Sequence, residues 1–248
     1  MKIGLFIPCF MNELYPEVCK ATYKILKNQG LDIDYPLSQT CCGQPMANSG
    51  CAKDVKQLAI SFVNTFKDYD YIVAPSGSCV SMVKEHYSEF FNDDKDYNKV
   101  KASIYEVCEF LHDVIKLENV KFSHSFPYKV GLHNSCHGHR VLKLATASEL
   151  NIPYNSKLKN LLNKVEGIEL VTLRREDECC GFGGTFSVAE EAVSVAMGKD
   201  RIKDHLDSSA QIMTGADMSC LMHMDGIINR DKNPIKVMHI VEILAGVR

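Results

Sequence analysis

The chain has 248 residues, 46% of them hydrophobic, and 28 basic residues stand against 31 acidic ones for a formal net charge of −3. This composition is typical of a globular protein with one large domain or two small ones. Because like charges form no long block, nucleic acid is not an expected partner. No run of about eighteen uncharged apolar residues is present, so no membrane span is expected.

The amino terminus predicts a buried β-strand followed by a helix. The apolar run Ile3–Ile7 is too short for a signal peptide, lacks a cleavage site and is stopped by Pro8, so we expect a soluble cytoplasmic protein. Cys9 follows directly. Apolar residues then recur at helical spacing, which predicts an amphipathic helix: Leu14, Val18, Ala21 and Ile25.

Eleven cysteines are the most unusual feature of the composition. In a reducing compartment thiols do not persist as structural disulfides, so this number indicates metal binding or redox chemistry. A free cysteine can also be a small buried hydrophobic residue. The spacing of the cysteines must separate the two uses.

The first half of the chain places cysteines after predicted strands and in one loop. Cys9 ends the first apolar run, Cys41-Cys42-Gly43 forms a loop, and Cys79 follows the apolar run Tyr71–Ala74. A second amphipathic helix is predicted after the loop from apolar residues at spacings of three and four: Val55, Leu58, Ala59, Phe62, Val63 and Phe66.

The second half repeats this order. Cys136 ends the run that begins at Val130, Cys179-Cys180-Gly181 forms a loop, and Cys220 follows Gln211–Thr214. The separations are 32, 1 and 37 positions in the first half and 43, 1 and 40 in the second. Four matches in the same order indicate an internal duplication.

A helix is also predicted after the second loop. Ser187 and Glu190 have the spacing of a capping box. The residues expected on its apolar face are Val188, Ala192, Val195 and Ala196.

Two cysteines outside the repeated pattern are interpreted as core residues. The two halves end alike, Val107–Leu111 matching Ile240–Leu244, so Cys108 stands opposite Val241 and fills core space. Cys19 lies on the first helix and is given the same interpretation. The role of Cys51, nine residues after Cys42, stays open.

The alternation of strands and helices predicts an α/β fold. We expect two pseudo-symmetric lobes from an internal duplication, each a mostly parallel sheet flanked by helices, facing each other across a shared cleft. Residues 1–122 form the first repeat and residues 123–248 the second, with the boundary in the polar segment Glu118–Ser125. Such sheets bind ligands at the carboxyl ends of their strands, where the repeated cysteines are predicted to lie.

Four thiols in each half favour a metal centre. A free thiol has a pKa of about 8.5, and a soft metal deprotonates it outright. Adjacent cysteines at a turn suit the corners of an iron–sulfur cluster, whereas a single zinc ion is better served by Cys-x-x-Cys pairs. Zinc stays possible. Gly43 and Gly181 supply the backbone freedom for the turn.

Other polar groups near the second loop are given lesser roles. The glycine run Gly181–Thr185 is a weak match to a phosphate-binding loop and is better explained by close approach of the backbone to a cluster. The histidines that flank Cys136 are interpreted as surface or supporting groups rather than ligands: His133, His137 and His139.

The whole chain resembles the CCG-domain iron–sulfur proteins, which include subunits of heterodisulfide reductase and of glycolate oxidase and members that serve lactate utilisation. Segments that look like those of the lactate-utilisation members carry the resemblance: Thr40–Pro45, Ala74–Cys79, Cys179–Ser187 and Val237–Ile240.

The resemblance implies two iron–sulfur clusters, one in each half. It also implies an electron-carrying subunit of a cytoplasmic complex that oxidises L-lactate to pyruvate, with companion subunits that include a second iron–sulfur protein. This subunit is not expected to turn over lactate alone, and no catalytic residue is assigned. The implied ligands are Cys9, Cys41, Cys42 and Cys79 for one cluster and Cys136, Cys179, Cys180 and Cys220 for the other.

One departure from the longer family pattern bears on the type of cluster. The pattern ends in Cys-x-x-Cys, but Ser76 and Asp217 occupy the first position of that pair here. The sequence therefore favours four-cysteine 4Fe–4S sites over a five-cysteine cluster. Asp217 is interpreted as a cap or turn residue, with an oxygen ligand or a proton acceptor as the alternative.

Two other functions stay open. A zinc-stabilised interaction subunit would use the same thiols, with zinc in one or both sites. A thiol–disulfide protein would use Cys41-Cys42 or Cys179-Cys180 as a redox pair.

Overall fold

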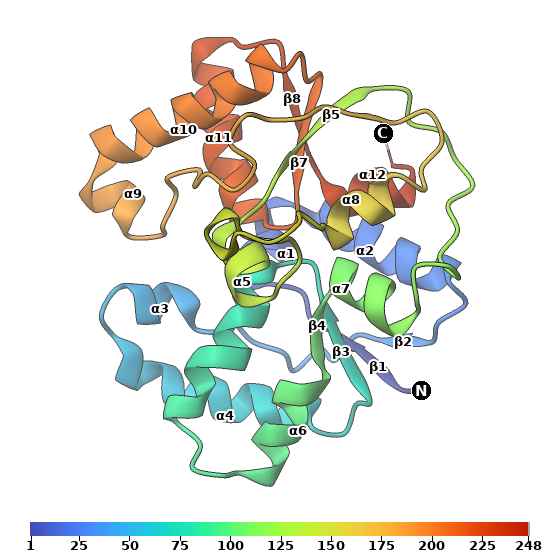
Figure 1. The fold of residues 1–248 in the computed structure, drawn as a ribbon. Helices are drawn as coiled ribbons and strands as arrows, with labels where there is room; N and C mark the ends of the chain where they lie inside the picture. Colours follow the sequence, from blue (N-terminus) through green and yellow to red (C-terminus); the bar gives the residue numbers. More distant parts are fainter. Residues whose placement is uncertain (248) are drawn as a thin grey trace.

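The computed structural model describes residues 1–247, which form two four-stranded sheets in the lower and upper parts of Figure 1. Among the described residues, neighbouring strands in each sheet run parallel. The first sheet has the order β2-β1-β3-β4 and the second the order β6-β5-β7-β8. The strands are β1 (Ile3–Leu5), β2 (Ile33–Asp34), β3 (Tyr71–Ala74), β4 (Ile104–Glu106), β5 (Lys129–His133), β6 (Glu169–Leu170), β7 (Ile212–Gly215) and β8 (Lys236–His239).

The fold class predicted from the sequence is therefore confirmed. The strand orders of the two sheets correspond one to one, as a duplication requires. Both sheets are flanked by helices, because a helix that packs on a sheet buries one of its faces there. The boundary between residues 122 and 123 stays a prediction.

The helices of the first half follow the apolar spacing of the sequence. Residues Val18, Ala21 and Ile25 are buried on α2, but Leu14 is 63% exposed, because the chain turns at Tyr15 and Pro16 and starts a new helix. The helical elements are α1 (Cys9–Leu14), α2 (Pro16–Asn28), α3 (Gln44–Asn48), η1 (Ala52–Asp54), α4 (Val55–Phe66), α5 (Gly77–Ser81), η2 (Met82–His86), η3 (Tyr87–Glu89), α6 (Lys95–Ser103), α7 (Val107–Glu109) and η4 (Phe110–Val114).

The helices of the second half are less regular in their sequence pattern. They comprise η5 (His137–Val141), η6 (Ser148–Leu150), α8 (Lys157–Leu162), α9 (Phe186–Ala189), α10 (Glu191–Asp207), α11 (Met218–Asp231) and α12 (Ile240–Ala245). Of these, α10 is the long helix that follows the second Cys-Cys-Gly loop (Figure 1).

The expected apolar face after the second loop is wrong. Val188 is 83% exposed and Ala192 is also exposed, and neither α9 nor α10 has a side-chain cap. The buried residues of α10 are instead mostly small or polar, among them Ser194, Gly198 and Arg201. Small residues are needed because α10 packs closely on α11: a Cβ added to Gly198 would lie 2.4 Å from the side chain of Ile227.

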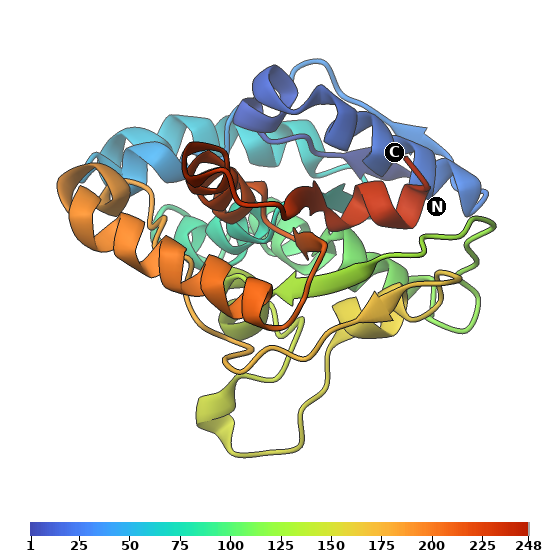
Figure 2. The ribbon, with the colours of Figure 1, turned by 90° about the horizontal axis from the view of Figure 1, so that it is seen from above.

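The two halves pack against each other through equivalent elements. The α-helix that follows the last strand of each half contacts the other half, α12 against α2 and α7 against α8, and α5 contacts η5. Figure 2 shows the red carboxyl-terminal helix beside the blue amino-terminal segment. Helices within residues 1–247 are all too short or too polar to cross a membrane.

Glu106 at the end of β4 is a buried acid that we predict to make stability depend on pH. Its carboxylate accepts hydrogen bonds from the backbone N–H groups of Cys108 (2.7 Å) and Glu109 (3.2 Å), but burial dominates and raises its pKa from 4.5 to about 8. Between these two values the unfolded chain has lost the proton that the folded chain keeps. The free energy of unfolding should therefore fall as the pH rises from 4.5 to about 8.

Urea titrations at several pH values test this prediction. Glu106→Gln should remove most of the fall, whereas Glu89→Gln, a change at an exposed glutamate on η3, should leave it in place. The same pH dependence in both variants would show that another group is responsible.

Candidate metal centres

The repeated cysteines all follow strands or lie in the loops beside them. Cys9 opens α1 after β1, Cys79 lies in α5 after β3, Cys136 precedes η5 after β5, and Cys220 lies in α11 after β7. Parallel strands end at one edge of their sheet, so each lone cysteine is brought to the edge where ligands bind in α/β folds.

The first group of four thiols forms a chain of sulfur contacts. The thiol of Cys41 interacts with those of Cys9 and Cys42, and the thiol of Cys42 interacts in turn with that of Cys79, closely enough to shift their pKa values. The backbone N–H of Gly43 also donates to the Cys41 sulfur at 3.4 Å. The structure therefore brings together the four cysteines of the first half, which we name the first thiol group.

The second group repeats this arrangement contact for contact. The thiol of Cys179 interacts with those of Cys136 and Cys180, and that of Cys180 interacts with Cys220, closely enough to shift their pKa values. The backbone N–H of Gly181 donates to the Cys179 sulfur at 3.3 Å. We name these four cysteines the second thiol group. The interactions couple four cysteines in each half, and the assignment of these eight as ligands stays a prediction.

The electrostatics of each thiol group favour a bound cation. Hydrogen bonds from Cys42 and Cys9 lower the pKa of Cys41 to about 3, and those from Cys136 and Cys180 lower the pKa of Cys179 to about 2. The same contacts raise the pKa of Cys42 and of Cys180. A second negative charge beside the first is unfavourable, so each group favours one thiolate. A bound metal ion would remove this penalty, and the donor set therefore fits a thiolate-ligated metal centre.

The Cys-Cys-Gly turns depend on their glycines. Gly43 has φ +82° and Gly181 has φ +88°, in the left-handed region that other residues rarely adopt. A Cβ on Gly43 would lie 2.6 Å from Val55, and a Cβ on Gly181 would lie 2.6 Å from the carbonyl oxygen of Ser194. The first turn therefore packs tightly against α4 and the second against α10.

We predict that Gly181→Ala destabilises the protein by on the order of 3 kcal/mol, because backbone strain adds to a clash with a fixed carbonyl oxygen. Gly50→Ala is the matched control, because Gly50 also has φ +82° but no atom of residues 1–247 lies within 4 Å of its added Cβ, so the change should cost about 1 kcal/mol. Urea unfolding followed by circular dichroism measures both. Equal losses would show that contact with Ser194 has no energetic effect.

The three remaining cysteines lie apart from the thiol contacts described above. Cys108 is fully buried, in agreement with a core role, and the thiol of Cys19 donates to the carbonyl oxygen of Tyr15 at 3.5 Å. Cys51, whose role the sequence left open, is exposed and lies 4.0 Å from the carbonyl oxygen of Ser49.

Asp217 joins the two halves through hydrogen bonds. Its buried carboxylate accepts from the backbone N–H of Ser78 (2.7 Å), from the Ser78 hydroxyl (3.1 Å) and from the Ser219 hydroxyl (2.9 Å). Ser76, its counterpart in the first half, forms an isolated β-bridge with it. These contacts favour the structural interpretation of Asp217 over a role as an oxygen ligand.

Of the three histidines near Cys136, His133 lies at the second thiol group. It is 1% exposed, and a ring nitrogen lies within 4.8 Å of the sulfur atoms of Cys180 and Cys220. Its Nδ1 accepts a hydrogen bond from Nε of Arg201 (3.2 Å), whereas Nε2 has no partner among the described residues. Burial and the nearby Arg201 charge lower the pKa of His133 to about 3.

Arg201 is a residue that the sequence interpretation missed. Its side chain is fully buried on α10 and pairs with Asp204 at 3.0 Å. The internal repeat could have indicated it, because alignment of the two Cys-Cys-Gly loops sets this charged residue opposite an apolar position of α4.

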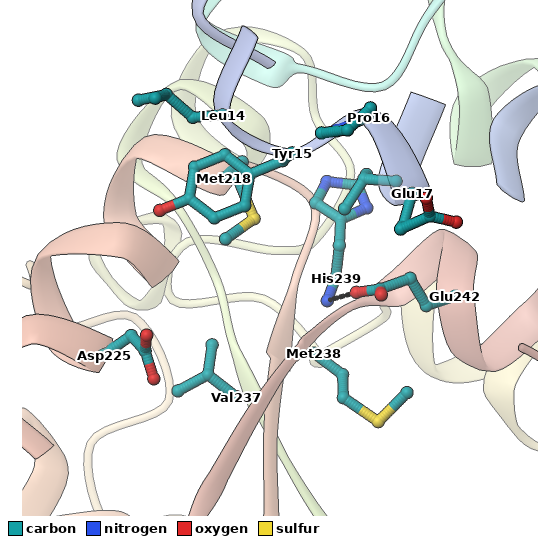
Figure 3. Close-up of a pocket in the computed structure, with 11 residues that line it drawn as sticks. Leu14, Tyr15, Pro16, Glu17, Met218, Asp225, Val237, Met238, His239 and Glu242 are labelled. Atoms are coloured by element: carbon teal, nitrogen blue, oxygen red, sulfur yellow. Dashed lines mark hydrogen bonds between the residues drawn. The ribbon is translucent and has the colours of Figure 1, made fainter. Parts of the chain in front are cut away.

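A pocket of about 230 Å³ lies between the halves (Figure 3). Tyr15 from the first half lines it together with Met218, Asp225 and Glu242 from the second, and burial raises the pKa of Asp225. None of the eight grouped cysteines lines it. This pocket is therefore separate from the thiol groups.

The duplicated fold and its paired thiol groups define a class of cysteine-rich proteins, and the chain belongs to the CCG cysteine-rich domain family. The family model matches residues 3–84 and 130–225, one segment in each half. This agrees with the resemblance seen in the sequence.

Full-length relatives are named Lactate utilization protein A. The one from Geobacillus thermodenitrificans is 41% identical over 98% of this chain and 98% of its own length, and the one from Halalkalibacterium halodurans is 39% identical over 98% and 96%. Among solved structures, a putative Asp/Glu racemase from Yersinia pestis covers 99% of this chain and 96% of its own with a TM-score of 0.38 and 14% identity, too distant a likeness to bear on function.

Proposed function

We propose that this protein is an electron carrier in L-lactate oxidation and that each thiol group holds one iron–sulfur cluster, of the 4Fe–4S type. The observation that carries the proposal is the identical chain of sulfur contacts in the two halves. The proposed ligands are Cys9, Cys41, Cys42 and Cys79 in the first centre and Cys136, Cys179, Cys180 and Cys220 in the second.

When bound, such a cluster supplies a carrier of single electrons whose potential depends on hydrogen bonds to its sulfurs and on its exposure to solvent. The chain's own contribution is to hold four thiolates together and to direct backbone N–H groups at them. Gly43 and Gly181 already direct such N–H groups at Cys41 and Cys179. Cys42 and Cys180 are each 3% exposed, which limits access of water.

Oxidation of L-lactate to pyruvate releases two electrons and two protons, so a protein with two one-electron centres suits the reaction. The name of the full-length relatives supports lactate as the source of the electrons. We propose that companion subunits in the cytoplasm, one of them a second iron–sulfur protein, bind lactate and exchange electrons with this chain. The chain alone should not oxidise lactate.

A buried connection between the two thiol groups supports transfer from one to the other. Ser78 precedes Cys79, Ser219 precedes Cys220, and the carboxylate of Asp217 accepts a hydrogen bond from both serines. The residues next to a proposed ligand of each centre are thereby joined through one side chain.

Zinc is the second candidate, because four thiolates are also a zinc ligand set. The observation in its favour is the compactness of part of the second group, where ligand atoms of His133, Cys180 and Cys220 lie within 4.8 Å of one another. A zinc ion there would make the protein an interaction subunit with at most one redox centre.

Purification of the full chain without oxygen, followed by quantitation of iron, sulfide and zinc, tests the proposal. We expect roughly eight irons and eight sulfides per chain for two 4Fe–4S clusters, with an electron paramagnetic resonance (EPR) signal on reduction. A colourless protein with zinc alone would overturn the proposal. A metal-free protein that keeps thiol–disulfide activity would favour a redox pair of adjacent cysteines.

A further inference from the structure

The two halves differ at one position beneath the thiol groups. The lone cysteines Cys9 and Cys136 are equivalent, and three residues before them stand Phe6 and His133. Phe6 is fully buried and His133 is 1% exposed. The place that a phenyl ring takes in the first half is thus taken by an imidazole in the second.

The partners of these residues differ in the same way. Alignment of the two helices with one extra residue after the second Cys-Cys-Gly loop sets Phe62 of α4 opposite Arg201 of α10, and Phe66 opposite His205. The packing agrees with this alignment at the equivalent glycines of β1 and β5. An added Cβ on Gly4 would lie 3.1 Å from Phe66, and one on Gly131 would lie 2.3 Å from His205.

An aromatic cluster in the first half is therefore replaced by a basic cluster in the second. The ring of Phe6 packs edge-on to Phe62 at a centroid distance of 4.8 Å and to Phe66 at 5.8 Å. In the second half, Arg201 donates a hydrogen bond to His133 and pairs with Asp204. The ion pair with Asp204 therefore fixes the position of Arg201 beside His133.

This contact fixes the tautomer of His133. An arginine Nε–H can only donate, so Nδ1 of His133 must offer its lone pair, and the proton of the neutral ring lies on Nε2. A metal ligand would need the lone pair of Nε2 instead. Within residues 1–247 the Nε2 atom has no partner, and the ring lies beside the sulfurs of Cys180 and Cys220.

We propose that His133 is a positioning residue that donates an Nε2–H···S hydrogen bond to the second centre, is not a metal ligand, and makes this centre easier to reduce than the first, where Phe6 stands in its place. The inference depends on the proposed function, because it requires a cluster in each thiol group. A hydrogen bond to sulfur stabilises the more negative, reduced form, and the buried charge of Arg201 acts in the same direction. Electrons on this chain would then rest on the second centre.

Redox titration of the anaerobic full-length protein, followed by EPR, tests the inference. His133→Phe, which copies the first half, should lower the potential of one centre and leave the other unchanged. We expect the ratio of reduced to oxidised second centre to fall about tenfold at a fixed potential, about 59 mV for one electron, the effect of one hydrogen bond to a charged group. His133→Gln keeps an N–H donor and should retain most of the potential, and Phe6→Leu should leave both potentials unchanged.

A second measurement needs no substitution and so decides the matter even if His133→Phe fails to fold. Pulsed EPR on the reduced protein should show a weak nitrogen coupling and an exchangeable proton that is lost in D₂O. A strong nitrogen coupling would mean direct ligation and would overturn the inference, as would unchanged potentials in His133→Phe. Failure of the proposed function is distinguishable from both, because the unmodified protein would then contain no cluster signal.

Discussion

Cys180→Ser is expected to lower the iron content from about eight to about four atoms per chain, with loss of half of the cluster absorbance. Cys180 lies in the middle of its group, between Cys179 and Cys220, so its loss breaks the chain of sulfur contacts. A serine hydroxyl stays protonated at neutral pH and is a poor ligand for a soft metal. Iron and sulfide quantitation after anaerobic purification measures the effect.

The duplication supplies a second, independent form of the same experiment. Cys42 has the equivalent place between Cys41 and Cys79, so Cys42→Ser should also remove about half of the iron. The double variant should contain none and should fail to support growth on lactate. Full iron content in both single variants would contradict the assignment of the two thiol groups.

Two other cysteines serve as controls. Cys51 is exposed and lies outside the thiol contacts, so Cys51→Ser should leave iron content and stability unchanged. Cys108 is fully buried in the core, so Cys108→Ala should lower the free energy of unfolding by about 1 kcal/mol without loss of iron. Iron loss in Cys51→Ser would place that residue among the ligands.

The parts of the fold that the sequence predicted are those in which apolar spacing carries the signal. The run Tyr71–Ala74 is β3, and the apolar stripe from Val55 to Phe66 is the buried face of α4. The buried face of the equivalent helix α10 was not predicted, because it contains Ser194, Gly198 and Arg201 instead of an apolar stripe. Periodicity of hydrophobic residues cannot find a face that is buried for close packing and for hydrogen bonding.

The candidate site was also predicted only in part from the sequence. The spacing of the cysteines indicated two groups of four, because the strand ends and the duplicated loops bring them to equivalent places. The sequence did not distinguish His133 from His137 and His139, since the distinction depends on Arg201 at 68 residues' distance along the chain. The role of Asp217 was open for a similar reason: its main donors belong to Ser78 in the other half.

Asp217→Ala is expected to lower the free energy of unfolding by about 3 kcal/mol. The carboxylate is 2% exposed and accepts three hydrogen bonds, two of them from Ser78 across the boundary of the halves. Its removal leaves the buried Ser78 N–H without a partner, and hydrogen bonds to a charged group contribute more than neutral ones. Urea unfolding followed by circular dichroism measures the loss.

Ser76→Ala is the matched control, because Ser76 occupies the equivalent position of the first half. Its hydroxyl caps α5 through a hydrogen bond from the N–H of Cys79 at 3.3 Å, a contact within one half, so its loss should cost about 1 kcal/mol. Asp217→Ala should also broaden the unfolding transition, since it weakens the link that couples the halves. Equal losses and equally sharp transitions in the two variants would show that Asp217 contributes no more than a helix cap, and that contacts such as α12 against α2 hold the halves together.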